Sequence, residues 1–385
     1  MKRWKIAGLF AMALMVSAAP FQAFATSPEF AYTAEKWASL RDNKLEYGEI
    51  ADLIHEYNTT VRQNELDYQE YKGKASTDIA EEYYDSANEV SERISYPDDD
   101  SANYANQIAS ALNSEISVTN LTEQGDSNVD DGEIKHLGYE QQEKNLVQQA
   151  QKLMISYYSG KASLATLEDA VTQAETAYTQ AQTRKAAGMA LQSDLDTAAE
   201  AVTNAKASLQ SAKSSLEQTK QQLIIMMGWN YNDSVEIGSL PDVDTSVVSK
   251  INVTSDIQTA IANNYSVKIT ERRLANSQSE NNRATYTNTL ANQKETVSTN
   301  VKNAYNSLVL AKNSYDQAKT SYDLAEKERA AAELRLSAGT ITKKTYEKQE
   351  SACLSAKTSM ETAKLSFLTA QVTYDWAVAG LASVS

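Results

Sequence analysis

The fold follows from one segment, Arg184-Lys185-Ala186-Ala187-Gly188-Met189-Ala190-Leu191-Gln192-Ser193-Asp194-Leu195, which lies between two long heptad patterns. Upstream of it, mostly apolar or small residues recur at alternating steps of four and three: Leu153, Tyr157, Gly160, Leu164, Leu167, Val171, Ala174, Tyr178 and Ala181. The same spacing continues downstream from Leu195 to Met226. A sustained period of about 3.5 residues predicts helices that coil around their neighbours. Gly188 can adopt the left-handed conformation that ends a helix, so the segment predicts the tip of an antiparallel hairpin.

The same tip occurs a second time further along the chain. Arg335-Leu336-Ser337-Ala338-Gly339-Thr340 repeats Arg184 to Met189 at an offset of 151 positions (339 − 188), and heptad patterns flank this copy as well. An internal repeat of this size predicts two copies of one structural unit. Alanine occupies many heptad positions, which lets several helices pack closely side by side. The predicted fold class is therefore all-α, with two repeated long antiparallel coiled-coil hairpins that form part of an α-helical barrel.

Composition and charge exclude some classes of function. The formal net charge of −15 argues against a nucleic-acid binder, because phosphate attraction needs a basic face. The two histidines, His55 and His136, have no metal-ligand spacing and no nucleophile partner, and no glycine-rich phosphate loop is present. We therefore expect neither an enzyme nor a cofactor or metal. The single cysteine, Cys353, occupies a heptad position and is expected to be a packed core thiol.

The first residues have the pattern of a secretory signal. Lys2, Arg3 and Lys5 precede an apolar run that is too short to be a stable membrane span, and Ala23-Phe24-Ala25 forms a small-x-small cleavage site. The expected location of the mature chain is therefore outside the cytoplasm.

Changes in composition divide the sequence into seven segments. These are a signal (1–25), an N-terminal helix of the first repeat (26–94), an acidic loop or insertion (95–138), the first hairpin (139–228), a connector (229–256), a long helix with the second hairpin (257–380) and a tail (381–385). Residues 266–337 contain no glycine or proline, which predicts one continuous helix of roughly 110 Å. Residues 126–132 resemble a calcium loop, but the glycine is one place late and Leu137 stands where an EF-hand has glutamate, so a plain solvated loop is favoured.

Taken together, these features resemble the TolC outer-membrane efflux family. The resemblance rests on the two hairpins with their Arg-x-x-x-Gly tips, the segment from Leu223 to Trp229 and the Leu240-Pro241 connector, and it covers roughly residues 34–380. It implies a homotrimer whose helices form a tunnel and whose hairpin tips dock onto an adaptor (membrane-fusion) protein, and through it onto a transporter in the inner or cytoplasmic membrane. Eight residues would form the docking tips: Arg184, Ala187, Gly188, Met189, Arg335, Ala338, Gly339 and Thr340.

The sequence departs from the family pattern at two points. Residues 281–301 lack the alternating apolar strands that a lipid-facing barrel needs, so we expect little or no β-barrel. This favours a barrel-less relative from a Gram-positive-like envelope, with the outer membrane as the alternative location. Family members carry acidic residues just beyond the second tip that ring the narrow end of the tunnel. The corresponding candidate gate residues are of mixed charge here: Asp194, Asp196, Lys343, Lys344 and Glu347.

Two functions fit these observations. The first is an export conduit that docks tip-to-tip with an adaptor. The alternative is a structural coiled-coil protein of the cell envelope without a transport role. The duplicated glycine tips favour the conduit, because a simple rod needs no paired turns.

Overall fold

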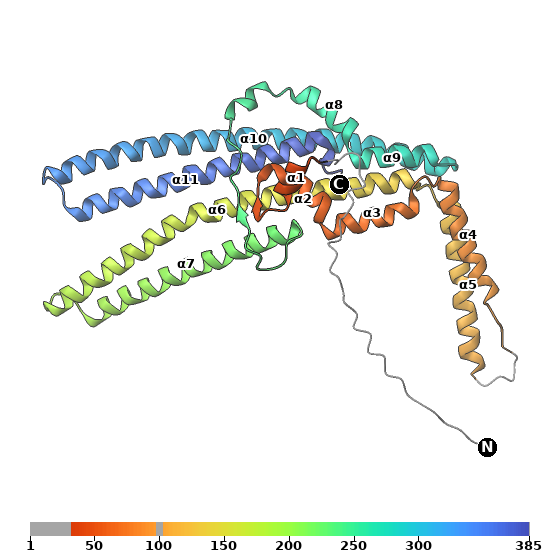
Figure 1. Ribbon diagram of the computed structural model, residues 1–385, viewed down its shortest axis with the longest axis horizontal. Coiled ribbons are helices and arrows are strands. Elements are labelled where there is room, and N and C mark those ends of the chain that lie inside the picture. The colour runs from red at the N-terminus through yellow and green to blue at the C-terminus, as the bar shows by residue number, and fades with distance from the viewer. Residues whose placement is uncertain (1–31, 98–102, 385) are drawn as a thin grey trace, which may run out of the picture.

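The computed structural model describes residues 32–97 and 103–384, which form a long helical body with one arm projecting from an end (Figure 1). The predicted signal, residues 1–25, lies outside the described residues. Four long helices build most of the body: α6 (Gly132–Ala186), α7 (Gln192–Met226), α10 (Glu280–Ser337) and α11 (Lys343–Trp376). Helices α6 and α7 form one antiparallel hairpin, and α10 and α11 form the other. Helix α11 packs on α6, so the helices lie in the order α7, α6, α11, α10. The all-α prediction with two long hairpins is confirmed.

Heptad seams hold the limbs of each hairpin together. On α10, Val301 and Leu308 are fully buried in one hydrophobic cluster with Phe367 of α11. Burying each such side chain contributes about 1.5–3 kcal/mol relative to leaving it in water. Most of the helical stability therefore comes from packing along these seams.

Shorter elements cover the end of the body opposite the tips. They include a two-stranded parallel sheet that joins the N-terminal region to the connector, with Lys44 opposite Glu236 and Leu45 opposite Ile237. The elements are α1 (Ala34–Leu40), β1 (Lys44–Leu45), η2 (Tyr47–Glu49), α2 (Ile50–Tyr57), α3 (Thr59–Tyr71), β2 (Glu236–Ile237), η3 (Thr245–Lys250), α8 (Val253–Asn263), α9 (Tyr265–Asn276) and η4 (Ala377–Leu381). The N-terminal helix expected over residues 26–94 is a series of shorter helices over residues 32–94, and residues 26–31 lie outside the described residues. Asn58 ends α2 in an extended conformation and caps α3, so the chain turns there.

The duplication extends beyond the hairpins into these shorter helices. The side-chain oxygen of Asn58 accepts hydrogen bonds from the start of α3, and its amide donates to the Met226 carbonyl at 2.9 Å. Asn264 repeats both roles, capping α9 and donating to the Ala382 carbonyl at 2.8 Å. The two asparagines are 206 positions apart (264 − 58), whereas the tips are 151 apart. The first repeat therefore contains about 55 additional residues (206 − 151) between α3 and its tip.

The arm accounts for these additional residues. It consists of α4 (Ser76–Glu92) and α5 (Tyr104–Ser127), two helices that pack on each other. The prediction for residues 95–138 was an acidic loop or insertion. The loop is wrong, because α5 occupies most of this range, whereas an insertion agrees with the additional residues. The serine and threonine side chains of α5 donate to carbonyls four residues earlier, as Ser117 does to Asn113 at 3.0 Å, so they fit a helix. Gly125 allows close packing, because a Cβ there would lie 2.5 Å from Cε1 of Tyr84.

The predicted continuous helix over residues 266–337 is interrupted. Ser277 follows α9 in an extended conformation and α10 begins only at Glu280. Side chains at the end of α9 bind the root of the arm: Arg273 donates to the Asp130 carboxylate at 2.7 Å, and Asn276 donates to the Val129 carbonyl at 2.8 Å. The interruption thus lies where the second repeat meets the arm of the first.

The segment that resembles a calcium loop, which lies within the described residues, holds no free ligand set. The calcium-like segment is occupied by protein contacts, since Asp130 and Asp131 pair with Arg273 and Arg272. Among the described residues, no group of histidine, cysteine and acidic side chains is arranged to hold a metal ion. No helix in residues 32–97 or 103–384 combines the length and apolar character needed to cross a membrane.

Candidate functional site

The two hairpin tips are built by the same hydrogen bonds. At the first tip, the amide of Gly188 donates to the Lys185 carbonyl at 2.9 Å and that of Met189 donates to the Arg184 carbonyl at 2.8 Å. This pair of bonds is the Schellman motif, which needs a left-handed residue just after the helix. Gly188 supplies it with φ of +71°. No atom lies within 4 Å of a Cβ built on this glycine, so the backbone conformation and not crowding requires glycine.

The second tip reproduces this geometry. Gly339 has φ of +69°, and its amide donates to the Leu336 carbonyl at 2.9 Å. The amide of Thr340 donates to the Arg335 carbonyl at 2.9 Å, and its hydroxyl donates to the same oxygen. The predicted residues therefore occupy equivalent turn positions, with Ala187 and Ala338 as the two C-caps.

Exposed apolar side chains lie at both tips. Met189 is 66% exposed, Leu191 is 71% exposed and Leu334 is 71% exposed. Sequence reasoning missed Leu191 and Leu334 as candidates. The signal was the occurrence of large apolar residues off the heptad seam at a helix end. Three such side chains, left in water at one end of the molecule, suit that end for contact with another protein.

Contacts between the hairpins hold the tips side by side. Thr166 donates to Thr358 at 2.9 Å, Gln173 donates to Ser351 at 3.0 Å, and near the tips Lys344 donates to Gln180 at 3.3 Å. These bonds join α6 to α11 along their length. Both tips therefore point in the same direction at one end of the layer (Figure 1).

The candidate gate residues lie in the first turns of the two return helices. Asp194 accepts a hydrogen bond from the Leu191 amide at 2.9 Å, which caps α7, and Asp196 accepts from the Gln192 side chain at 2.7 Å. Glu347 pairs with Lys343 one turn away at 3.4 Å. A single chain does not bring the acidic residues of α7 together with the lysines of α11, so the gate stays a prediction.

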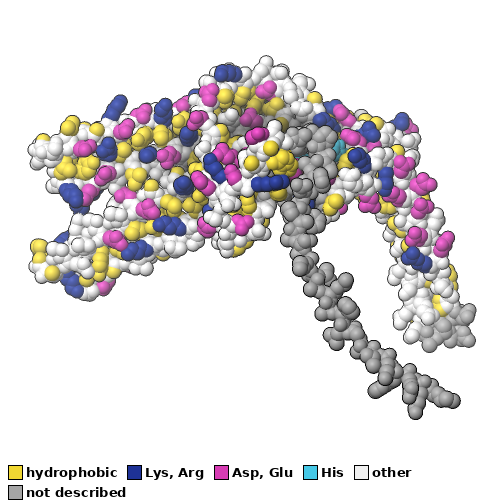
Figure 2. All heavy atoms as spheres, viewed as in Figure 1, with side chains coloured by type: hydrophobic (Ala, Val, Ile, Leu, Met, Phe, Trp, Pro, Cys, Tyr) yellow, Lys and Arg dark blue, Asp and Glu magenta, His cyan; other side chains and the backbone are white. Residues whose placement is uncertain are grey.

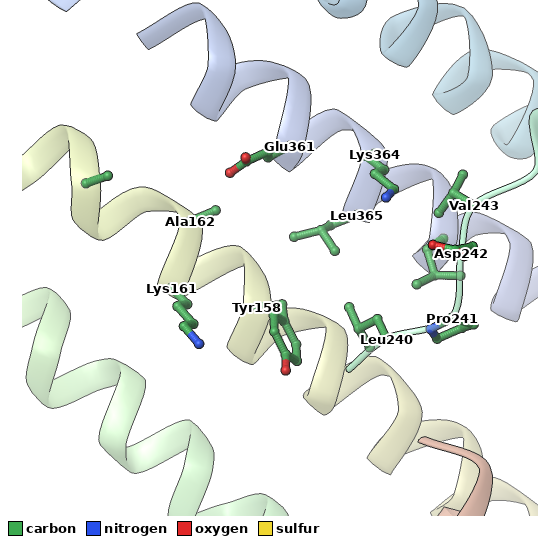
Figure 3. A pocket seen from close by; sticks show the side chains of 12 residues that line it. Tyr158, Lys161, Ala162, Leu240, Pro241, Asp242, Val243, Glu361, Lys364 and Leu365 are labelled. Atoms are coloured by element: carbon green, nitrogen blue, oxygen red, sulfur yellow. The ribbon is translucent and has the colours of Figure 1, made fainter. Parts of the chain in front are cut away.

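A cavity of about 480 Å³ lies where the connector crosses α6 and α11 (Figure 3). Leu240 and Pro241 of the connector face Tyr158 of α6 and Leu365 of α11. The Tyr158 hydroxyl donates to the Gly238 carbonyl at 2.6 Å and so ties the connector to α6. The cavity therefore marks a junction between the two repeats.

Helix α8 packs on α10 in the half of the layer away from the tips, and closer to the tips the outer helices α7 and α10 expose apolar or small side chains. Helix α10 exposes Leu310 (66%) and Leu324 (59%), which are not part of the seam that Val301 and Leu308 form with α11. Helix α7 exposes Ile225 (50%) and a row of small or uncharged polar residues such as Ala207 and Ser211. In Figure 2 hydrophobic side chains reach the surface along the limbs between the charged ones.

Comparison with solved structures identifies the fold. A membrane protein from Pseudomonas aeruginosa matches with a TM-score of 0.55 at 13% identity, covering 89% of this chain and 92% of that one. The CmeC outer membrane channel of Campylobacter jejuni matches with a TM-score of 0.51 at 11% identity, covering 94% of this chain and 92% of the channel chain. No protein-family model and no curated protein matches the sequence. The resemblance to TolC-like channels is thus confirmed at the level of the fold.

Proposed function

We propose that the protein is the conduit of a multipart exporter, and that it works as a homotrimeric tunnel docked through its hairpin tips onto an adaptor protein. The observation that carries this proposal is the layer of four limbs with both tips at one end and apolar side chains exposed on its two outer helices. Closing such layers into a ring places α7 of one copy against α10 of the next. Three copies would contribute twelve limbs to one helical wall.

Adaptor docking is supported by the chemistry of the tips. The exposed Met189, Leu191 and Leu334 provide an apolar surface. From Arg335 to Lys348 the second tip carries four basic residues and one acidic residue, Glu347. An adaptor would therefore present apolar side chains with acidic residues at the rim, since such complementarity favours association. The adaptor would link the conduit to a transporter in the cytoplasmic or inner membrane.

The proposed location is the cell envelope outside the cytoplasm. The secretory pattern of residues 1–25 supports export, and the two matched structures are described as a membrane protein and an outer membrane channel. An envelope of the Gram-positive kind stays a prediction from the sequence.

Electron microscopy of the signal-free chain without detergent tests the conduit. The proposal predicts particles with threefold symmetry and a central opening when viewed along the limbs. Solid rods without an opening would contradict it and would favour a structural coiled-coil protein of the envelope.

A further inference from the structure

The arm formed by α4 and α5 carries most of the net charge of the chain. Residues 76–127 contain twelve acidic residues and one basic residue, Arg93, which gives −11 of the total −15. Glu81, Asp85, Glu89 and Glu92 follow one another on α4 at steps of four and three, and all four are exposed. Like charges at this spacing destabilise a helix, so the row lowers the stability of α4 unless positive charge lies nearby. Figure 2 shows acidic side chains outnumbering basic ones on the arm.

The second helix of the arm has a different surface. Helix α5 carries three acidic residues and no basic one, and it exposes Leu112 (49%) and Ile116 (58%). These two continue a row with the exposed Ala105 and Ala109, at steps of four, three and four. Such spacing places the four side chains on one face of a helix. The face is not the one that packs on α4, because that seam uses Ala111 and Gly125.

The direction of the arm is fixed at its root. The Asp131 carboxylate, buried at 2% exposure, accepts hydrogen bonds from Arg272 at 2.6 Å and from Asn276 at 2.8 Å. Asp130 is held by two nitrogens of Arg273 at 2.7 and 3.1 Å. From this root the arm runs in the direction that leads from α10 across the layer to α7, and it extends beyond the α7 side (Figure 1). Helix α5 alone is about 36 Å long (24 residues), so the arm reaches past the edge of its own copy.

The opposite edge of the same end, called the basic edge below, carries an excess of basic residues over acidic ones. Residues 264–302, which cover α9 and the start of α10, contain six basic and three acidic residues. Arg272 and Arg273 are engaged with Asp131 and Asp130 of their own chain, and Lys294 pairs with Glu271 at 2.9 Å. Arg283 and Lys302 are exposed. In a ring with α7 of one copy beside α10 of the next, the acidic arm of the first copy lies over the basic edge of the second copy.

We propose that the arm of each copy lies across α9 and the first turns of α10 of the neighbouring copy, with the Leu112–Ile116 face of α5 packed against it. The acidic α4 supplies attraction to the basic edge, and the apolar α5 face supplies the contact area. Three arms then form a helical collar that holds the ring together at the end opposite the tips. This inference rests on the ring of the proposed function.

Site-specific photo-crosslinking tests the contact. Benzoylphenylalanine replaces Ile116 in one variant and Ser117 in a control. Ser117 is also exposed and lies about 100° around the same helix. Isotopically labelled and unlabelled chains are mixed, so that mass spectrometry separates links between copies from links within one copy. We expect links between copies, ending within residues 264–302, with at least fivefold higher yield from position 116 than from position 117.

The possible results distinguish the proposal about the arm from the proposal about the ring. The arm proposal is overturned, and the ring stands, if light scattering shows an oligomer but the links from position 116 do not reach residues 264–302 of another copy. Such links would stay within one chain or end in another region or on another molecule. A chain that stays monomeric throughout overturns both. Equal yields from positions 116 and 117 contradict packing through the apolar face of α5.

Discussion

At the scale of single residues, the tip glycines have one role, which is to close the turn. Gly188 and Gly339 have φ of +71° and +69°, and neither has neighbouring atoms that a side chain would strike. Other residues would lose roughly 1–2 kcal/mol of stability in this left-handed conformation, so the backbone alone accounts for glycine at both positions. The heptad break made both turns predictable from sequence. The exposed leucines beside them were not predictable, because nothing in a heptad pattern reports which apolar residues lack a partner.

Replacing Gly188 and Gly339 with valine tests whether the turns form the docking surface. We expect each substitution to lower the free energy of unfolding by about 1–2 kcal/mol. Helicity by circular dichroism should be unchanged, and retention of the adaptor in a pull-down should be lost. Gly73→Val is the matched control, since Gly73 also has a positive φ of +80° with no atom within 4 Å of a Cβ but lies between α3 and α4, away from the tips. Unchanged adaptor retention by the Gly188 and Gly339 variants would show that docking does not depend on the turns.

His55 makes the attachment of α2 to α6 sensitive to pH. Its Nδ1 lies 3.3 Å from the carboxylate of Glu143. Burial alone would lower the pKa of His55, but the hydrogen bond and charge of Glu143, with smaller contributions from Glu56 and Glu65, outweigh it and raise the pKa. A raised pKa in the folded state means that the stabilisation is complete below the unfolded pKa of about 6.5 and is lost as pH rises through the folded value.

The pH dependence can be measured by urea unfolding between pH 5.5 and 8.5. We expect the free energy of unfolding to decrease by roughly 0.5–1 kcal/mol across this range because of the pair. Glu143→Gln should flatten the decrease. An equally steep decrease in that variant would assign the pH dependence to other groups.

At the scale of elements, sequence pattern succeeded where helices pack by heptads and failed where they do not. The limbs of both hairpins were predicted because their seams repeat over many turns. Helix α5 was expected to be a loop, since asparagine, serine and aspartate favour turns. In the structure its hydroxyl side chains bond to carbonyls of the same helix, as Ser117 does to Asn113. The interruption after Asn276 was missed because it depends on contacts with the distant root of the arm rather than on glycine or proline.

Asp131, at the root of the arm, anchors the arm to α9. Burial alone would raise the pKa of Asp131, but hydrogen bonds from Asn276, Arg272 and the Ile134 amide together hold the pKa below its usual value. A lowered pKa means that the stabilisation is present above the unfolded pKa of about 3.9 and is lost as pH falls through the folded value. Asp131→Asn should therefore lower the free energy of unfolding by about 2 kcal/mol at pH 7.

Urea unfolding at pH 7 and at pH 3 checks this expectation. The difference between the natural chain and Asp131→Asn should narrow at pH 3, because pH 3 lies below the unfolded pKa of about 3.9 and the unfolded chain then binds a proton that the folded carboxylate resists. Asp126→Asn is a suitable control, since Asp126 accepts one exposed hydrogen bond from Tyr84 at 2.8 Å. A difference that stays the same at both pH values would mean that the charge of Asp131 does not anchor the arm.

At the scale of the whole molecule, the layer is incomplete as a single chain. Its helices lie in the order α7, α6, α11, α10, and the two end helices expose apolar side chains such as Leu310 and Ile225 to water. The inserted arm adds an acidic extension at one end, and the second tip adds basic residues at the other. A closed ring buries the edges of every copy. The number of copies was implied by the family resemblance and cannot be read from one chain.

The solution mass of the chain without residues 1–25, measured by light scattering in the absence of detergent, tests the ring most directly. A closed ring predicts three times the mass of one chain, held by contacts between α7 of each copy and α10 of the next. The mass of a single chain at every concentration would contradict it, because the exposed edges would then be stable in water without a partner.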